Sequence, residues 1–143
     1  MALTGNEIIQ AVAPDGAGHP AAVPLNISVA NLLGSGLPTD NAANGLVSAG
    51  NNQATALALT KNYNVVATVA SSTGVVLPAA SIGQTIYVFN NGANVLQVYG
   101  NGSDTIDGVA GSTGVPLTNA KRCAYVCVAA NTWISAQLGV VSA

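Results

Sequence analysis

Apolar and polar residues alternate through the second half of the chain with the period of two that is typical of β-strands. In the stretch 63–69, Tyr63 and Val65 lie on one face and Asn64 lies on the other. The stretch 84–89 is apolar on both faces, which indicates a strand that is buried on both sides. Further short strands are predicted at 75–77, 94–99, 105–106, 115–117, 122–128 and 133–138.

Turn-forming residues separate these segments. The chain contains 16 Gly and 6 Pro, and the sequence Asn90-Asn91-Gly92 is a tight-turn signal. About eight short strands at this spacing are typical of a β-sandwich or barrel. We therefore predict an all-β fold, an antiparallel β-sandwich of jelly-roll type over residues 51–143. The segment 51–60 fits either a strand or one helical turn, and no repeat of fixed period is visible.

The first 50 residues differ in composition from the rest of the chain. They are rich in Gly, Pro, Ala and Asn, with short apolar pieces at Ile8-Ile9 and Leu32-Leu33. We predict an extended N-terminal arm and linker over 1–50, with a strand at 7–12 and an exposed linker at 34–50. Such an arm can add a strand to a neighbouring subunit, so Ile8, Ile9, Leu32 and Leu33 are interface candidates.

Charge is scarce, with three basic and five acidic residues among 143, whereas an ordinary soluble domain is about 25% charged. This composition predicts that other subunits cover much of the surface. Nucleic acid is excluded as a partner because phosphate binding needs clustered Lys and Arg. A membrane-spanning helix is also not expected, because polar residues interrupt every apolar stretch.

No basic start followed by an apolar run opens the chain, so we expect synthesis in a host cytoplasm. Cys123 and Cys127 agree with that expectation. Four residues apart on a strand they are roughly 13 Å apart, too far for a disulfide. They are interpreted as small buried apolar residues, with a metal pair completed by other chains as the alternative.

Catalytic chemistry is not expected. His19 is the only histidine and lies in a predicted turn, and the motifs of nucleophilic, nucleotide-binding and zinc-dependent enzymes are absent. Asp104 and Asp107 lie in a turn rich in oxygen ligands. The sequence favours side-chain hydrogen bonds that hold this turn, with calcium as the alternative. We therefore expect no enzyme activity, cofactor or metal.

Three aromatic residues are candidates for the core or for an interface between subunits. Tyr87 and Phe89 share a face of the strand predicted at 84–89, and Trp133 opens the last predicted strand. Large aromatic side chains are favoured where much area is buried. A sugar platform is the alternative interpretation for Trp133.

Two regions resemble known virion proteins. The stretch 3–9, Leu-Thr-Gly-Asn-Glu-Ile-Ile, resembles the opening of many small tailed-phage virion proteins. The second resemblance covers most of the remaining chain and is similar to the β-rich module of phage capsid decoration (cement) proteins and head fibres. Its residues are 75–80, 82–84, 88–93, 98–99 and 106–108, followed by Trp133.

The resemblance implies a structural role. Decoration proteins bind the outside of a phage head, often as homodimers or homotrimers, and stabilise contacts between subunits of the major capsid protein. The expected location is therefore the outer capsid surface of the virion. Because such modules also occur at fibre tips, a receptor-binding head or tail-fibre tip is the alternative function.

Overall fold

The computed structural model describes residues 8–9, 27–28 and 41–139. The chain divides into two compact units, Met1–Asp40 and Asn41–Ala143. In the first unit, strands β1 (Ile8–Ile9) and β2 (Ile27–Ser28) pair in antiparallel orientation. β1 lies inside the strand predicted at 7–12. The described part of the second unit, 41–139, is called the β domain below.

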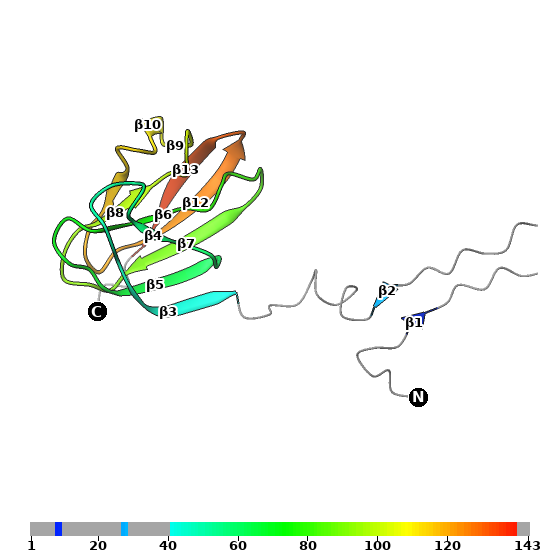
Figure 1. Cartoon of the computed structure of the whole chain (residues 1–143), viewed down its shortest axis with the longest axis horizontal. Helices are drawn as coiled ribbons and strands as arrows, with labels where there is room; N and C mark the ends of the chain where they lie inside the picture. The colour runs from blue at the N-terminus through cyan, green and yellow to red at the C-terminus, as the bar shows by residue number, and fades with distance from the viewer. Residues whose placement is uncertain (1–7, 10–26, 29–40, 140–143) are drawn as a thin grey trace, which may run out of the picture. The chain divides into compact units, whose positions relative to one another are not determined.

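Six strands of the β domain form a β-solenoid, in which the chain passes back and forth between two sheets (Figure 1). They are β3 (Ala42–Val47), β4 (Leu57–Ala58), β5 (Tyr63–Thr68), β6 (Gly74–Val76), β7 (Thr85–Asn90) and β8 (Leu96–Tyr99). β3, β5 and β7 are parallel neighbours in one sheet, and β4, β6 and β8 are parallel neighbours in the other. β3, β5 and β7 begin at residues 42, 63 and 85, and β4, β6 and β8 begin at residues 57, 74 and 96, so equivalent strands start 17 to 22 residues apart.

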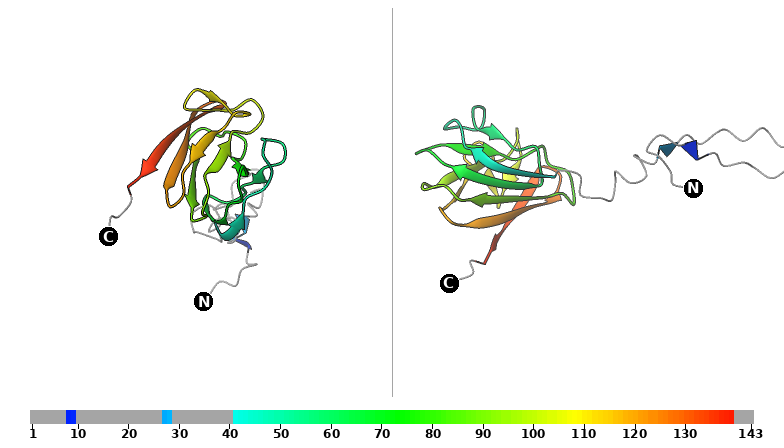
Figure 2. Two further views of the ribbon diagram at one scale, coloured as in Figure 1. Left: turned by 90° about the vertical axis from the view of Figure 1, so that its left-hand side faces the viewer. Right: turned by 90° about the horizontal axis from the view of Figure 1, so that it is seen from below.

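Five further strands close the solenoid. They are β9 (Thr105–Ile106), β10 (Val109–Ala110), β11 (Val115–Leu117), β12 (Arg122–Ala129) and β13 (Thr132–Leu138). β11 adds to β8 in antiparallel orientation and completes a four-stranded sheet, β11-β8-β6-β4. β12 pairs antiparallel with both β7 and β13 in the seven-stranded sheet β10-β9-β13-β12-β7-β5-β3. Figure 2 shows β12 and β13, in orange and red, on the side of this sheet away from β3, in cyan.

The prediction of an antiparallel jelly roll is wrong, although the described elements of the β domain are all strands. The reason is that a jelly roll pairs its strands antiparallel, whereas here each coil returns to the same sheet and places its strand parallel to the previous one. The turn signal at residues 90–92 accordingly does not close a hairpin. It carries the chain from β7 in the seven-stranded sheet to β8 in the four-stranded sheet. The coils repeat in strand positions, at spacings of 17 to 22 residues, and not in residue identities, so no repeat of fixed period was visible in the sequence.

The hydrophobic core lies between the two sheets. Side chains at alternate positions of a strand point into this core. In β7, for example, Ile86 and Val88 are buried, whereas Tyr87 and Phe89 are half-buried. The largest fully buried side chain is Trp133, from β13. The other core residues include Leu59, Val66, Val69, Val75, Leu77, Leu96, Val98, Ile106, Leu117, Cys123, Tyr125 and Cys127.

Two fully buried asparagines hold the ends of the coils. The Asn64 amide nitrogen donates to the carbonyls of Lys61 (2.8 Å) and Tyr87 (3.2 Å) and so links β5 to β7. The Asn90 amide nitrogen donates to the carbonyls of Asn94 and Leu117, each at 2.9 Å. These bonds pair each buried amide nitrogen with two backbone carbonyls.

Two stretches that the sequence left uncertain are now placed. β3 forms inside 34–50, where a linker was expected, and it pairs with β5. Its register shifts between Ala43 and Leu46 and again between Leu46 and Val47, and Gly45, inside the first shift, has a positive φ of 75°. Such irregularities protect an edge strand from pairing with other chains. The ambiguous segment 51–60 contains the short strand β4 and no helix.

Candidate interaction face

One surface of the seven-stranded sheet is predominantly apolar and faces away from the core. It is formed by the outward residues of β5, β7, β12 and β13 and is called the outer face below. The strand registers align these residues in three rows across the sheet. The first row is Tyr63, Tyr87, Ala124 and Ala136, the second is Val65, Phe89, Arg122 and Leu138, and the third is Thr85, Val126 and Ile134.

Contacts within the rows hold the aromatic side chains of the outer face in place. The rings of Tyr63 and Tyr87 stack with their centroids 4.8 Å apart and their planes within 2°. The Arg122 guanidinium lies 5.8 Å from the centroid of the Phe89 ring, in reach of a cation–π contact. The face is therefore ordered before any partner arrives, so that less side-chain entropy is lost on binding.

The outer face is exposed and almost free of charge. Tyr63 and Ile134 are 47% and 45% exposed, and Arg122 is the single charged residue in β5, β7, β12 and β13. Interface cores are depleted of charge and enriched in aromatic residues and Arg, as here. A sheet surface of this composition suits burial against another protein.

The interface candidates of the sequence fall in different places. Tyr87 and Phe89 lie on the outer face, whereas Trp133 is fully buried in the core and is not available to a partner or a sugar. Ile8 and Ile9 form β1, and Leu32 and Leu33 lie outside the described residues.

Sequence reasoning missed several members of the outer face. It did not select Tyr63, Val65 or Ile134, because the strand order that brings them onto one face with Tyr87 and Phe89 was not predicted. The sequence did not show that the four-stranded sheet covers only one side of the seven-stranded sheet. The other side is therefore the exposed outer face. The alternation at 63–69 did mark Tyr63 and Val65 as sharing one face.

The two aspartates of the turn after β8 make structural hydrogen bonds. Asp104 is buried, and its Oδ2 accepts from the Ala80 amide at 3.0 Å and from the Trp133 indole at 3.3 Å. Asp107 accepts from the Ser135 amide at 2.8 Å and from the Ser135 hydroxyl at 2.6 Å. These bonds reach across to β13 and to the loop before β7, further than the local turn contacts that the sequence suggested. Within residues 41–139 and the two short arm strands, no three His, Cys, Asp or Glu residues gather as metal ligands.

The cysteines are free thiols and both are buried, as the sequence suggested. Burial raises the pKa of the Cys123 thiol, against a smaller opposing effect of its hydrogen bond with Tyr125. Burial likewise raises the pKa of Tyr125. Both groups therefore stay protonated at neutral pH, and a reactive thiolate is not formed.

No helix among the described residues is long and apolar enough to cross a membrane. His19 lies outside the described residues. Comparison with known proteins found no matching family model, no matching curated protein and no matching solved structure.

Proposed function

We propose that this protein is a structural virion protein, a capsid decoration or cement protein that binds the outside of a phage head. Its partners are copies of itself, as a homodimer or homotrimer, and the major capsid protein, whose subunit contacts it stabilises. The observation that carries the proposal is the outer face: an ordered, apolar sheet surface with one charge. The choice of a decoration protein among structural proteins rests on the resemblance of the turn and strand sequences to those of decoration proteins.

The outer face is the self-association surface in this proposal. Burial of apolar area contributes about 25 cal/mol per Å², although association costs offset much of that gain. Repeated on every copy around a shell, even modest contacts resist internal pressure. The arm with Ile8, Ile9, Leu32 and Leu33 is the shell-binding segment in this proposal, because its apolar pieces suit strand addition.

A non-catalytic role is consistent with the state of the reactive groups in the β domain. Asp104 and Asp107 are engaged in hydrogen bonds with the backbone, Trp133 and Ser135. Burial keeps the Cys123 thiol protonated. None of these groups combines a nucleophile with a base in the way that covalent catalysis requires.

The direct test is electron cryomicroscopy of the virions whose genome encodes the chain. We expect density for the β domain in many symmetry-related copies on the outer surface of the head. Density only at the tail or at a fibre tip would contradict the capsid role and favour the receptor-binding alternative. Absence of the protein from purified virions would reject both.

Substitution of Ile134 by Asp should break self-association. Ile134 is exposed on the outer face, so the isolated domain tolerates a solvated carboxylate there, whereas an interface would bury it without a partner. We expect the 143-residue chain to sediment as a dimer or trimer and the Ile134→Asp variant as a monomer, with a thermal midpoint within a few degrees of the unsubstituted chain.

The matched control for this variant is Ile82→Asp. Ile82 is 71% exposed and precedes β7 in a loop, outside the rows of the outer face. We expect this control to keep the oligomeric state. The self-association proposal fails if Ile134→Asp assembles normally, or if Ile82→Asp disrupts assembly to the same extent.

Retention on virions should be insensitive to salt. Exposed ion pairs contribute only about 0–1 kcal/mol each, and 1 M salt shortens the Debye length to about 3 Å. Apolar burial and backbone pairing are not weakened by such screening. We expect the protein to stay with pelleted virions in 1 M sodium chloride, as measured by gel densitometry. Its release by salt alone would indicate a charge-based contact instead.

A further inference from the structure

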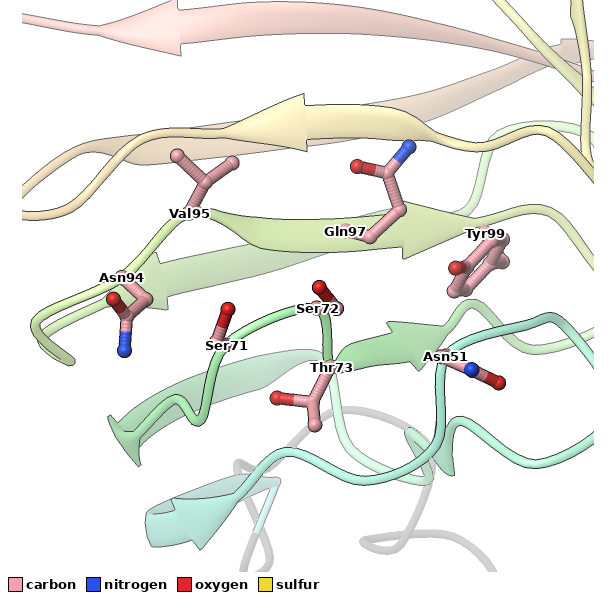
Figure 3. A pocket seen from close by; sticks show the side chains of 8 residues that line it. All are labelled: Asn51, Ser71, Ser72, Thr73, Asn94, Val95, Gln97 and Tyr99. Carbon is pink, nitrogen blue, oxygen red and sulfur yellow. The ribbon is translucent and has the colours of Figure 1, made fainter.

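A polar cavity lies on the opposite side of the β domain from the outer face, against the four-stranded sheet. Its volume is about 460 Å³, within the range of about 300–1,000 Å³ that is typical of small-molecule sites. None of its eight lining residues is charged. The side chains that matter below are Asn51, Ser71, Ser72, Asn94, Gln97 and Tyr99, drawn in Figure 3.

Tyr99 forms one wall of this cavity in a fixed position. It is only 5% exposed, and its ring lies between two glycine backbones. A Cβ atom added to Gly74 would lie 2.6 Å from Tyr99 Cε2, and one added to Gly114 would lie 2.8 Å from Cδ1. Figure 3 shows its hydroxyl oxygen on the side of the cavity. No hydrogen bond to a described residue occupies that hydroxyl, and its oxygen is accessible rather than buried, so it can bond a ligand in the cavity.

Hydrogen bonds orient the three amide side chains around the cavity. In each side chain they occupy either the amide nitrogen or the amide oxygen, and not both. The Gln97 amide nitrogen donates to the Thr113 carbonyl at 3.0 Å, and the Asn94 amide nitrogen donates to the Val69 carbonyl at 2.8 Å. Their oxygens remain as acceptors. The Asn51 oxygen accepts from Asn52 at 3.1 Å, which leaves its amide nitrogen as a donor.

The backbone at Ser72 is also held in an unusual form. Its φ is 63°, a left-handed conformation that non-glycine residues seldom adopt. The turn that contains it is closed by the Thr73 hydroxyl and amide, which donate to the Ala70 carbonyl at 2.8 and 3.3 Å. This turn presents the hydroxyls of Ser71 and Ser72 at the wall facing Gln97 (Figure 3).

We propose that this cavity is a binding site for a small neutral saccharide. A sugar hydroxyl both donates and accepts a hydrogen bond, so a site that offers amide oxygens, an amide nitrogen and hydroxyls without charge matches it. Anionic ligands are disfavoured because no lining side chain is cationic. The proposal stands independently of the capsid role, since the cavity and the outer face belong to different sheets.

The test is saturation-transfer difference NMR on the full 143-residue chain. The probes are glucose, galactose, N-acetylglucosamine and N-acetylneuraminic acid at millimolar concentration. We expect transfer to at least one of the neutral sugars and none to the anionic N-acetylneuraminic acid. Tyr99→Phe, which removes only the hydroxyl, should weaken that binding about three- to tenfold, and Gln97→Met should weaken it to a similar extent.

Two matched controls test whether the loss of saccharide binding is specific to the cavity. Tyr63→Phe on the outer face and the exposed Gln137→Met on β13 should leave saccharide binding unchanged. Both cavity variants should remain folded by circular dichroism and remain bound to virions, so that loss of sugar binding is distinguishable from failure of the capsid role. The proposal is overturned if no neutral sugar shows transfer, if transfer is undiminished in both cavity variants, or if an uncharged peptide binds there in place of every sugar.

Discussion

Replacement of Trp133 by Ala is expected to cause the largest loss of stability of any single substitution in the β domain. Removing a large buried aromatic side chain costs about 3–5 kcal/mol, and Trp133 is fully buried. The substitution also deprives the buried Asp104 carboxylate of the indole donor at 3.3 Å. Because 1 kcal/mol shifts the midpoint of a domain of this size by about 4–8 °C, the thermal midpoint should fall by at least about 12 °C.

The measurement is urea unfolding followed by circular dichroism at one protein concentration, since the substitution removes the only tryptophan. Tyr63→Ala is the control: it removes an aromatic side chain that is 47% exposed, so it should cost about 1 kcal/mol. A Trp133→Phe variant keeps most of the buried ring and should lie between the two. A loss for Trp133→Ala no greater than that for Tyr63→Ala would mean that Trp133 does not anchor the core.

Replacement of Asn90 by Leu is the second change with a large expected effect. The new side chain has a similar size but cannot replace three hydrogen bonds. Two are those of its amide nitrogen to Asn94 and Leu117, and the third is donated by the Gly92 amide to Asn90 Oδ1 at 3.0 Å. Each buried group left without a partner costs about 1–3 kcal/mol, so the free energy of unfolding should fall by about 3 kcal/mol or more.

The control is Asn44→Leu, at an exposed position of β3 whose side chain bonds only to the neighbouring Gly45 amide at 2.8 Å. Its effect should stay within about 0.5 kcal/mol. Chemical denaturation of both variants gives the comparison. Equal effects would show that the buried asparagine is dispensable and that the turn after β7 is held by its backbone alone.

The sequence predicted strands better than it predicted their partners. Alternation is a local property, so it located β5 and β7 and assigned Tyr87 and Phe89 to one face. Pairing is not local, as the alignment of Tyr63 with Tyr87 across a parallel ladder shows. The sequence of a strand does not indicate whether its partner is the next strand, joined by a hairpin, or a later strand, joined by a whole coil. The jelly-roll prediction followed from assuming the nearer partner.

The functional surfaces were predictable to different degrees for the same reason. Tyr87 and Phe89 could be selected as an apolar pair, but the outer face also needs Tyr63, which the strand order brings into the row of Tyr87, and Ile134, which lies in the row of Thr85. The cavity was not predictable at all. It combines residues from the 51–52 turn, the loop after β5 and strand β8, and only the coil geometry places Ser72 opposite Gln97.

The position of β12 has a consequence for synthesis on the ribosome. β12 lies between β7 and β13 in the middle of its sheet, yet in sequence it follows every described strand of the β domain except β13. Until residues 122–138 have left the exit tunnel, β7 presents an unpaired edge and the core lacks Trp133. The coils can form in the order of translation, but the domain cannot close until β12 and β13 are made. A chain that stalls before residue 122 should therefore expose an unpaired, aggregation-prone sheet edge and need protection by chaperones.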